Sequence, residues 1–176
     1  VFVVAPAAAA RVSAVATATM DQIDTRFVPH MLVVQKGTAV EFPNSDVVAH
    51  HVYSFSKPNN FVLPLYKGDA HAPITFEHAG VVILGCNIHD GMLGYIVVVD
   101  SGVFGITDVA GRVTLELEAG AGDYLVNIWS PRIRDDQESL QKTVSRQSDA
   151  TLVFGLQKKL RPPHDAQSIA VKWSEY

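Results

Sequence analysis

The chain has 176 residues, of which 48% are hydrophobic and 18% are charged. This content is enough to bury a core in one large domain or two small ones, and it excludes a disordered chain. Fourteen basic against eighteen acidic residues give a net charge of −4, which argues against a nucleic-acid-binding protein. No apolar run reaches the roughly 18–20 residues of a membrane-spanning helix. We therefore expect a globular protein whose partners are small molecules or proteins.

The sequence starts with an apolar, alanine-rich segment, VFVVAPAAAARVSAVATA over residues 1–18. Small residues after an apolar start are typical of the surroundings of a signal-peptide cleavage site, so we expect a processed, exported protein. An equally good interpretation is a pair of β-strands, at 1–4 and 12–18, joined by an alanine-rich connection. Both interpretations hold if cleavage lies just upstream.

Short β-type runs separated by turn residues dominate residues 20–100. The runs are HMLVV at 30–34, TAVEF at 38–42, HHVYSF at 50–55, PITFE at 73–77, VVILG at 81–85 and YIVVV at 95–99. Gly, Pro and Asn interrupt them about every ten residues, a spacing typical of an all-β sandwich. We therefore predict a β-sandwich domain over residues 20–100.

Residues 101–176 continue the β-type pattern with different turns. Apolar runs and alternating apolar residues predict strands at 113–117, 124–128, 150–156 and 168–173. Helical periodicity is visible only at 135–146 and is weak, with acidic residues leading and basic ones following as the helix dipole favours. Because these strands are too few for a sandwich of their own, we expect residues 1–19 to complete it. The domain at 20–100 would then be an insertion.

The chain's single cysteine stands in the segment GCNIHDGML, residues 85–93. One cysteine excludes an intramolecular disulfide and a structural zinc site built from two or more cysteines. Cys86 is therefore inert, catalytic or a metal ligand. His89 and Met92 follow it at intervals of three residues. A thiolate, two imidazoles and a weak thioether form the ligand set of a blue-copper centre, which this cluster would complete with one more histidine.

The missing histidine should come from a different strand, and the chain offers His50 and His51. Adjacent residues of a strand point to opposite faces, so only one of the two can readily reach a metal. Alternation alone does not choose, because the inward-facing sets that start at His50 and at His51 are both acceptable. The other histidines share no spacing and are expected to be exposed, although a second, weaker copper site at His30 or His71 stays an alternative.

Two segments resemble the halves of the type 1 copper site of cupredoxins: FPNSDVVAHHVYSF and FEHAGVVILGCNIHDGMLGYIVVVD. The Cys-x-x-His-x-x-Met spacing is similar to that of the short amicyanin-type ligand loop. Over about residues 20–100 the chain resembles bacterial periplasmic plastocyanin-like proteins that are often labelled methylamine-utilisation proteins. In that group, a segment similar to TDVAGRVTLELEAGAGDYLVNIWSP forms a carboxypeptidase-regulatory, transthyretin-like repeat.

This resemblance implies an all-β fold, with a Greek-key cupredoxin β-sandwich at 20–100 and a second, smaller transthyretin-like β-sandwich at 101–176. It also implies four copper ligands: His50, Cys86, His89 and, in the axial position, Met92. Asn44 falls where the amicyanin pattern has an Asn near the ligands. His51 stands where cupredoxins usually place an Asn that ties the two ligand loops together, so we expect it to bridge toward the Cys86 loop.

One copper ion held by four side chains, with no open coordination position, is suited to passing an electron between Cu(I) and Cu(II). The resemblance thus implies a periplasmic electron carrier, not an enzyme, that works through His89 with a c-type cytochrome or a periplasmic dehydrogenase. The alternative is a carrier or sensor that delivers or detects copper. A copper enzyme such as a nitrite reductase needs an additional metal site, and the sequence contains no convincing second cluster.

Overall fold

The structure, a computed structural model, describes residues 2–4, 17–68, 71–117, 123–136, 140–145 and 151–163. These residues form strands, turns and irregular segments without an α-helix, which confirms the predicted all-β class. None of them belongs to a helix long and apolar enough to cross a membrane. They divide into two units: one contains residues 17–99, and the other contains β1 (Phe2–Val4) and the described residues from Asp100 to Pro163.

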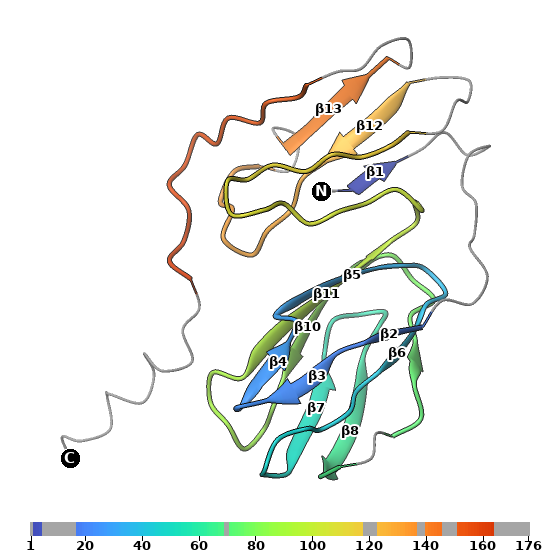
Figure 1. Cartoon of the computed structure of the whole chain (residues 1–176), viewed down its shortest axis with the longest axis vertical. Helices are drawn as coiled ribbons and strands as arrows, with labels where there is room; N and C mark the ends of the chain where they lie inside the picture. The colour runs from blue at the N-terminus through green and yellow to red at the C-terminus, as the bar shows by residue number, and fades with distance from the viewer. Residues whose placement is uncertain are drawn as a thin grey trace, which may run out of the picture. The chain divides into compact units, whose positions relative to one another are not determined.

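Two main sheets and a two-stranded hairpin form the larger unit (Figure 1). The strands of the main sheets are β2 (Thr17–Thr19), β5 (Met31–Gln35), β6 (Ala39–Glu41), β7 (His50–Ser54), β8 (Phe61–Tyr66), β9 (Ile74–Thr75), β10 (Gly80–Gly85) and β11 (Leu93–Val99). One sheet has the order β5-β11-β10-β7-β8 and the other the order β2-β6-β9. Since β5 is parallel to β11 and β2 is parallel to β6, the chain crosses between the sheets instead of forming a simple meander.

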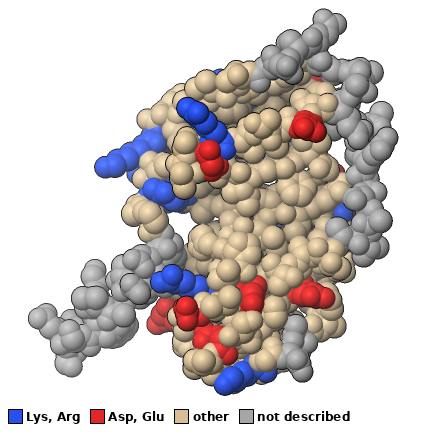
Figure 2. Space-filling model, viewed as in Figure 1, with Lys and Arg blue, Asp and Glu red and all other residues tan. Residues whose placement is uncertain are grey.

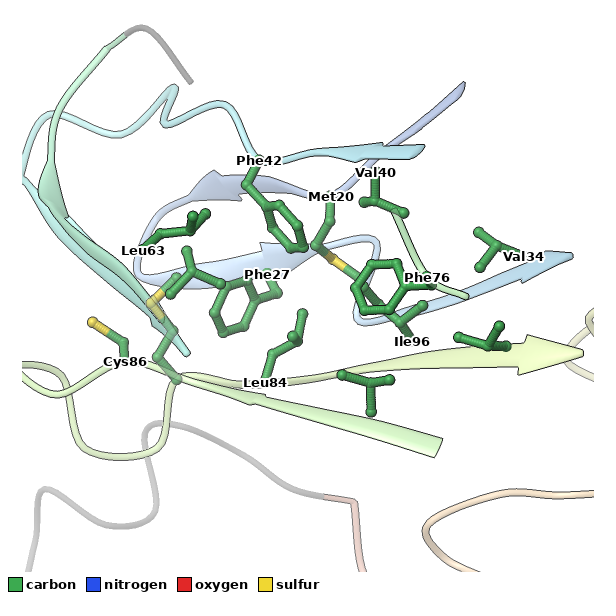
Figure 3. Close-up of a cluster of buried hydrophobic side chains, with 14 residues drawn as sticks. Met20, Phe27, Val34, Val40, Phe42, Leu63, Phe76, Leu84, Cys86 and Ile96 are labelled. Atoms are coloured by element: carbon green, nitrogen blue, oxygen red, sulfur yellow. The ribbon is translucent and has the colours of Figure 1, made fainter. Parts of the chain in front are cut away.

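The core of this unit draws on both sheets and on the loops between them. Its fully buried members include Phe42 and Phe76 beside the three-stranded sheet and Leu84 and Ile96 from the five-stranded one. Burying one such large side chain contributes roughly 1.5–3 kcal/mol. Figure 3 shows Cys86 at one end of this cluster, beyond Leu84 on the same stretch of chain. The core therefore extends up to the cysteine.

A short hairpin that the sequence analysis did not predict packs onto the five-stranded sheet. It consists of β3 (Asp21–Ile23) and β4 (Arg26–Val28), joined by a two-residue turn, Asp24-Thr25. Phe27 of this hairpin is buried directly over Gly94 of β11, where a Cβ atom would lie 2.8 Å from the Cβ of Phe27. The absence of a side chain at Gly94 thus lets the hairpin approach the sheet closely.

Six predicted runs coincide with strands β5, β6, β7, β9, β10 and β11. Strand β8 was missed, because its Pro64 lacks the N–H that a regular ladder requires. The pairing of β7 with β8 shifts register between His50 and Val52, and Pro64 lies in the part of β8 opposite this shift. The proline is therefore accommodated at an irregularity of the sheet.

The second unit has a three-stranded antiparallel sheet of order β1-β12-β13, with β12 at Tyr124–Asn127 and β13 at Gln141–Val144. Phe2–Val4 pairs with β12, as predicted for residues 1–4. The strand predicted at 12–18 is described only from Thr17, which with its neighbours pairs with β6 of the larger unit, so the expected contribution of this part to the second unit is wrong. A small cluster around Tyr124 and Val126 forms its core.

Other predictions for this part of the chain are wrong or fall outside the described residues. The helix predicted at 135–146 is wrong, because Gln141–Val144 pairs with β12 as a strand. The run at 113–117 and the described part, 151–156, of the run at 150–156 are not strands, although Leu115, Leu117 and Phe154 do pack on the small core. The run at 168–173 lies outside the described residues. A second, transthyretin-like sandwich is therefore not confirmed.

Candidate metal centre

The loop that carries Cys86 connects the adjacent antiparallel strands β10 and β11. Gly85 and Leu93 are paired across it, so residues 86–92 form a closed loop at the end of the sheet. Inside the loop, the Met92 N–H donates to the His89 carbonyl at 3.1 Å, and Gly91 has a φ of 86°. Glycine adopts that left-handed conformation without a steric penalty. The tight turn returns His89 toward Cys86.

The second histidine of the cluster comes from the neighbouring strand β7. The burial pattern of β7 alternates, with His50, Val52 and Ser54 buried and the two residues between them partly exposed. The sequence left open whether His50 or His51 faces inward, and this burial pattern shows that the inward-facing set starts at His50. His50 is itself completely buried.

The side chains of His50, Cys86 and His89 converge, with their ligand atoms all within 4.8 Å of one another. The Cys86 Sγ lies 3.6 Å from His89 Nδ1 and 3.9 Å from His50 Nδ1. The two Nδ1 atoms are 2.9 Å apart. His50 and Cys86 are buried, whereas His89 is partly exposed.

The carboxylate of Asp46, a residue not predicted from the sequence, contacts the Nε2 side of the His50 ring. His50 Nε2 lies 2.9 Å from Asp46 Oδ2. Hydrogen bonds from the Thr25 N–H and then from His50 lower the pKa of Asp46 to about 2, so it is a carboxylate at neutral pH. An Nε2–H that donates to this carboxylate leaves the lone pair of His50 Nδ1 directed at the cluster. The one available signal was an acidic residue four positions before the histidine.

His89 is favoured as a neutral imidazole. Burial is the largest cause that lowers its pKa below its usual value. Because His50 presents a bare Nδ1, we assign the 2.9 Å contact as a hydrogen bond donated by His89 Nδ1. A metal ion bound here would replace this hydrogen bond with two metal–nitrogen bonds, and His89 would give up that proton or move it to Nε2.

The donor set fits one type 1 copper site. The distances from Cys86 Sγ to the two Nδ1 atoms would leave space for an ion among the donors, whereas the two Nδ1 atoms, 2.9 Å apart, would have to separate to bind it. Two imidazoles and one thiolate, mostly shielded from water, are the trigonal ligands that define such centres.

The remaining predicted residues lie near the cluster in different ways. Met92 is 3% exposed and belongs to the same core as Cys86, and its axial role stays a prediction. Asn44 is buried and organises the loop before His50: its Nδ2 donates to the Val48 and Tyr66 carbonyls, and its Oδ1 accepts the Asp46 N–H.

His51 does not make the bridge expected of it. Its Nδ1 is buried without a hydrogen-bond partner, and within the described part of the chain it makes no hydrogen bond to the Cys86 loop. Of the other histidines, His30 packs edge-on against Tyr95 and His71 against Tyr66. Neither joins a second group of three ligand residues among the residues described.

Comparison with family models and with curated proteins gives no match. Among solved structures, a reduced mutant of amicyanin is 25% identical, with 51% of this chain and 89% of that chain covered and a TM-score of 0.43. A purple cupredoxin from Nitrosopumilus maritimus is 24% identical, covering 48% and 99% with a TM-score of 0.41. The solved structures that this chain resembles include amicyanin and other cupredoxins.

A copper-containing nitrite reductase from Thermus scotoductus SA-01 is also similar, at 31% identity and a TM-score of 0.43. That match covers 46% of this chain but only 22% of the nitrite reductase. All three likenesses extend over about half of this chain. The assignment of the metal site therefore rests on the donor atoms themselves.

Proposed function

We propose that this protein is a type 1 copper protein that transfers single electrons in the periplasm. The observation that carries the proposal is the convergence of His50, Cys86 and His89, whose ligand atoms lie within 4.8 Å of one another, with His50 and Cys86 buried. We further propose that residues 20–100, joined by β2 (Thr17–Thr19), form the copper-binding domain, that residues 101–176 with Phe2–Val4 form the second one, and that Met92 would supply the fourth ligand.

The chain's own residues favour electron transfer over substrate chemistry. Copper, when bound, supplies a one-electron couple between Cu(I) and Cu(II). Cys86 directly follows β10, and His50 lies on β7, the strand that pairs with β10, so the sheet holds both ligands in place. A site held in one geometry changes little when its charge changes. The burial of His50 and Cys86 also leaves little room for a substrate.

We expect electrons to enter and leave through His89, because it is the partly exposed member of the cluster. Large apolar side chains stand beside it and beside Asp46 in the sequence: Ile88 is 52% exposed and Val47 is 81% exposed. Figure 2 shows one face of the molecule on which acidic and basic side chains are interspersed among uncharged ones. We propose a c-type cytochrome or a periplasmic dehydrogenase as partner, met through a small transient interface.

The direct test is a visible absorption and EPR spectrum of the copper-loaded protein. We expect an intense thiolate-to-Cu(II) charge-transfer band, which Cys86→Ser removes while the circular dichroism of the β-sheet is retained. The reason is that only the thiolate supplies this transition, whereas the core is held by its apolar side chains. A Cys86→Ser protein that kept the band would contradict the copper assignment.

Two further measurements separate the alternatives. Reversible one-electron voltammetry with copper retained in both states supports an electron carrier, whereas loss of copper on reduction indicates a copper carrier or sensor. Because one similar structure is a nitrite reductase, nitrite is offered to the copper-loaded protein together with a reductant. We expect no nitrite consumption.

A further inference from the structure

The turn between β3 and β4 has an unusual backbone. Asp24 and Thr25 have φ angles of 50° and 56°, both in the left-handed region. Two-residue hairpin turns of this kind normally use Asn, Asp or Gly, since a β-branched residue such as threonine is sterically disfavoured there. A strained turn that persists is held by its surroundings and directs attention to what it contacts.

This turn contacts the copper site through one carboxylate oxygen. The Thr25 N–H donates to Asp46 Oδ2 at 2.7 Å, and the same oxygen accepts the Nε2–H of His50 at 2.9 Å. The other oxygen of Asp46 accepts the Val47 N–H at 2.6 Å. The Asp46 side chain is 6% exposed and that of His50 is 0% exposed. A continuous series of hydrogen bonds therefore runs from the strained turn to a ligand of the cluster.

We propose that Asp46 is a positioning residue for copper, held by the Thr25 N–H, which fixes His50 with its Nδ1 toward the metal and favours Cu(II) over Cu(I). The inference rests on the proposed function. A neutral imidazole can carry its proton on either nitrogen, and only the Nε2–H form both satisfies Asp46 and leaves Nδ1 free. The negative charge of Asp46, on the Nε2 side of the His50 ring, stabilises Cu(II) more than Cu(I). Because the Asp46 side chain is nearly buried, water and salt screen this charge weakly.

The simpler alternative is that Asp46 only closes its own loop. Its bond to the Val47 N–H and the bond of its own N–H to Asn44 would be enough for that role. A loop-closing residue affects stability but has no reason to select a tautomer of His50 or to shift a reduction potential. These two quantities therefore decide between the alternatives.

The first measurement uses the metal-free wild-type protein, so it does not depend on copper or on a variant. Nitrogen–proton NMR correlations of the His50 ring report which nitrogen carries the proton. We expect the proton on Nε2. A proton predominantly on Nδ1 would overturn the inference, whatever the copper spectrum shows.

The second measurement is the reduction potential of copper-loaded Asp46→Asn, which keeps the shape and removes the charge. We expect the affinity for Cu(II) to fall at least tenfold relative to that for Cu(I). For a one-electron couple, this raises the reduction potential by at least about 59 mV. Asp46→Glu restores the charge and should recover most of the wild-type potential. The matched control is Glu77→Gln, which removes an exposed carboxylate from the same unit and should shift the potential much less.

The outcomes separate this inference from the proposed function. Equal potentials in Asp46→Asn and Glu77→Gln, with a normal charge-transfer band, overturn the role of Asp46 and leave the copper assignment intact. Absence of the band in the loaded wild-type protein overturns the copper assignment itself. If Asp46→Asn does not fold, Thr25→Gly serves in its place. It keeps the N–H that holds Asp46, so the His50 proton should stay on Nε2 as in the wild type, and a His50 proton predominantly on Nδ1 in both proteins overturns the inference.

Discussion

Within β7, two adjacent histidines have different surroundings. His50 is completely buried and takes part in the cluster with Cys86, whereas His51 is partly exposed and lies on the other side of the strand. Because side chains alternate along a strand, His50 faces the cluster and His51 faces away from it.

We expect His50→Ala to abolish the type 1 spectrum or to open the site to an external ligand. His51→Ala should keep the spectrum, since its Nδ1 makes no hydrogen bond to the ligand loops in the described structure. Visible absorption of the two copper-loaded variants, compared at equal metal content, is the measurement. Reversed spectra would mean that the register of β7 is wrong by one residue.

Tyr66 provides a pH-dependent contribution to stability. Burial raises its pKa to about 12 from an ordinary value of 10.0, although a hydrogen bond from the Gln22 amide acts in the opposite direction. Its hydroxyl donates to the Phe42 carbonyl at 2.5 Å, a bond that requires the neutral form. The folded state therefore favours the protonated phenol.

The sign of the effect follows from the raised pKa. The stabilisation is fully present below pH 10, and it is lost as the pH rises from 10 to about 12, because the unfolded chain loses its proton first. We expect the unfolding free energy of the wild type to fall across this range. In Tyr66→Phe this part of the fall should disappear. Denaturant unfolding at a series of alkaline pH values measures it, and identical slopes in both proteins would contradict the prediction.

At the scale of strands, the Tyr53 ring of β7 occupies the space that a side chain at Gly85 of β10 would need. A Cβ atom added to Gly85 would lie 2.8 Å from both Cζ and Oη of Tyr53, its cross-strand partner. Real Cβ atoms do not come that close, so the Tyr53 ring or the strand must shift. Since Gly85 directly precedes Cys86, such a shift would also reach the cluster.

Gly85→Ala should therefore destabilise the metal-free protein by about 1–3 kcal/mol, the usual cost of overpacking. The control is Gly155→Ala, at a residue where an added Cβ would meet nothing within 4 Å; its effect should stay within about 0.5 kcal/mol. Denaturant unfolding of both variants makes the comparison. Equal stability of the two would show that the Tyr53 ring moves aside freely.

Elements and site differ in how far the sequence predicts them. The strands of the larger unit follow from apolar runs and regular turns, but β8 contains Pro64 and was missed. The helix at 135–146 was wrong because the charge order of DDQESLQKTVSR favours a helix locally, whereas pairing with β12 imposes a strand.

The same distinction applies to the residues of the cluster. Cys86 and His89 lie in one short loop, so their spacing in the sequence reflects their spacing in space. The placement of Asp46 depends instead on the Thr25 N–H, 21 residues away in the sequence, and on Asn44, which also bonds the distant Tyr66 carbonyl. The spacing of Asp46 and His50 is local, but the contact with Thr25 follows from no local pattern. Which of His50 and His51 faces the cluster likewise follows only from the folded sheet.

For the molecule as a whole, copper should act as a stabilising ligand. An ion that binds only the folded state stabilises it by about 2.7 kcal/mol at a free concentration one hundred times its Kd. We expect thermal unfolding to move to higher temperature with copper and to return on chelation. The shift should be absent in Cys86→Ser, and an equal shift there would indicate binding elsewhere on the chain.

The pairing of β1 with β12 has a consequence for the time course of synthesis. Phe2 pairs with Asn127, and every strand of the larger unit lies between them in the chain. At about 5–20 residues per second, the ribosome needs roughly 6–25 s to reach β12 after making β1. Strands β2 to β11 are complete within that interval, whereas β1 must wait for its neighbour. Strand β1 thus waits for a sheet partner that is made long after it, whereas the strands of the larger unit have their partners within the interval.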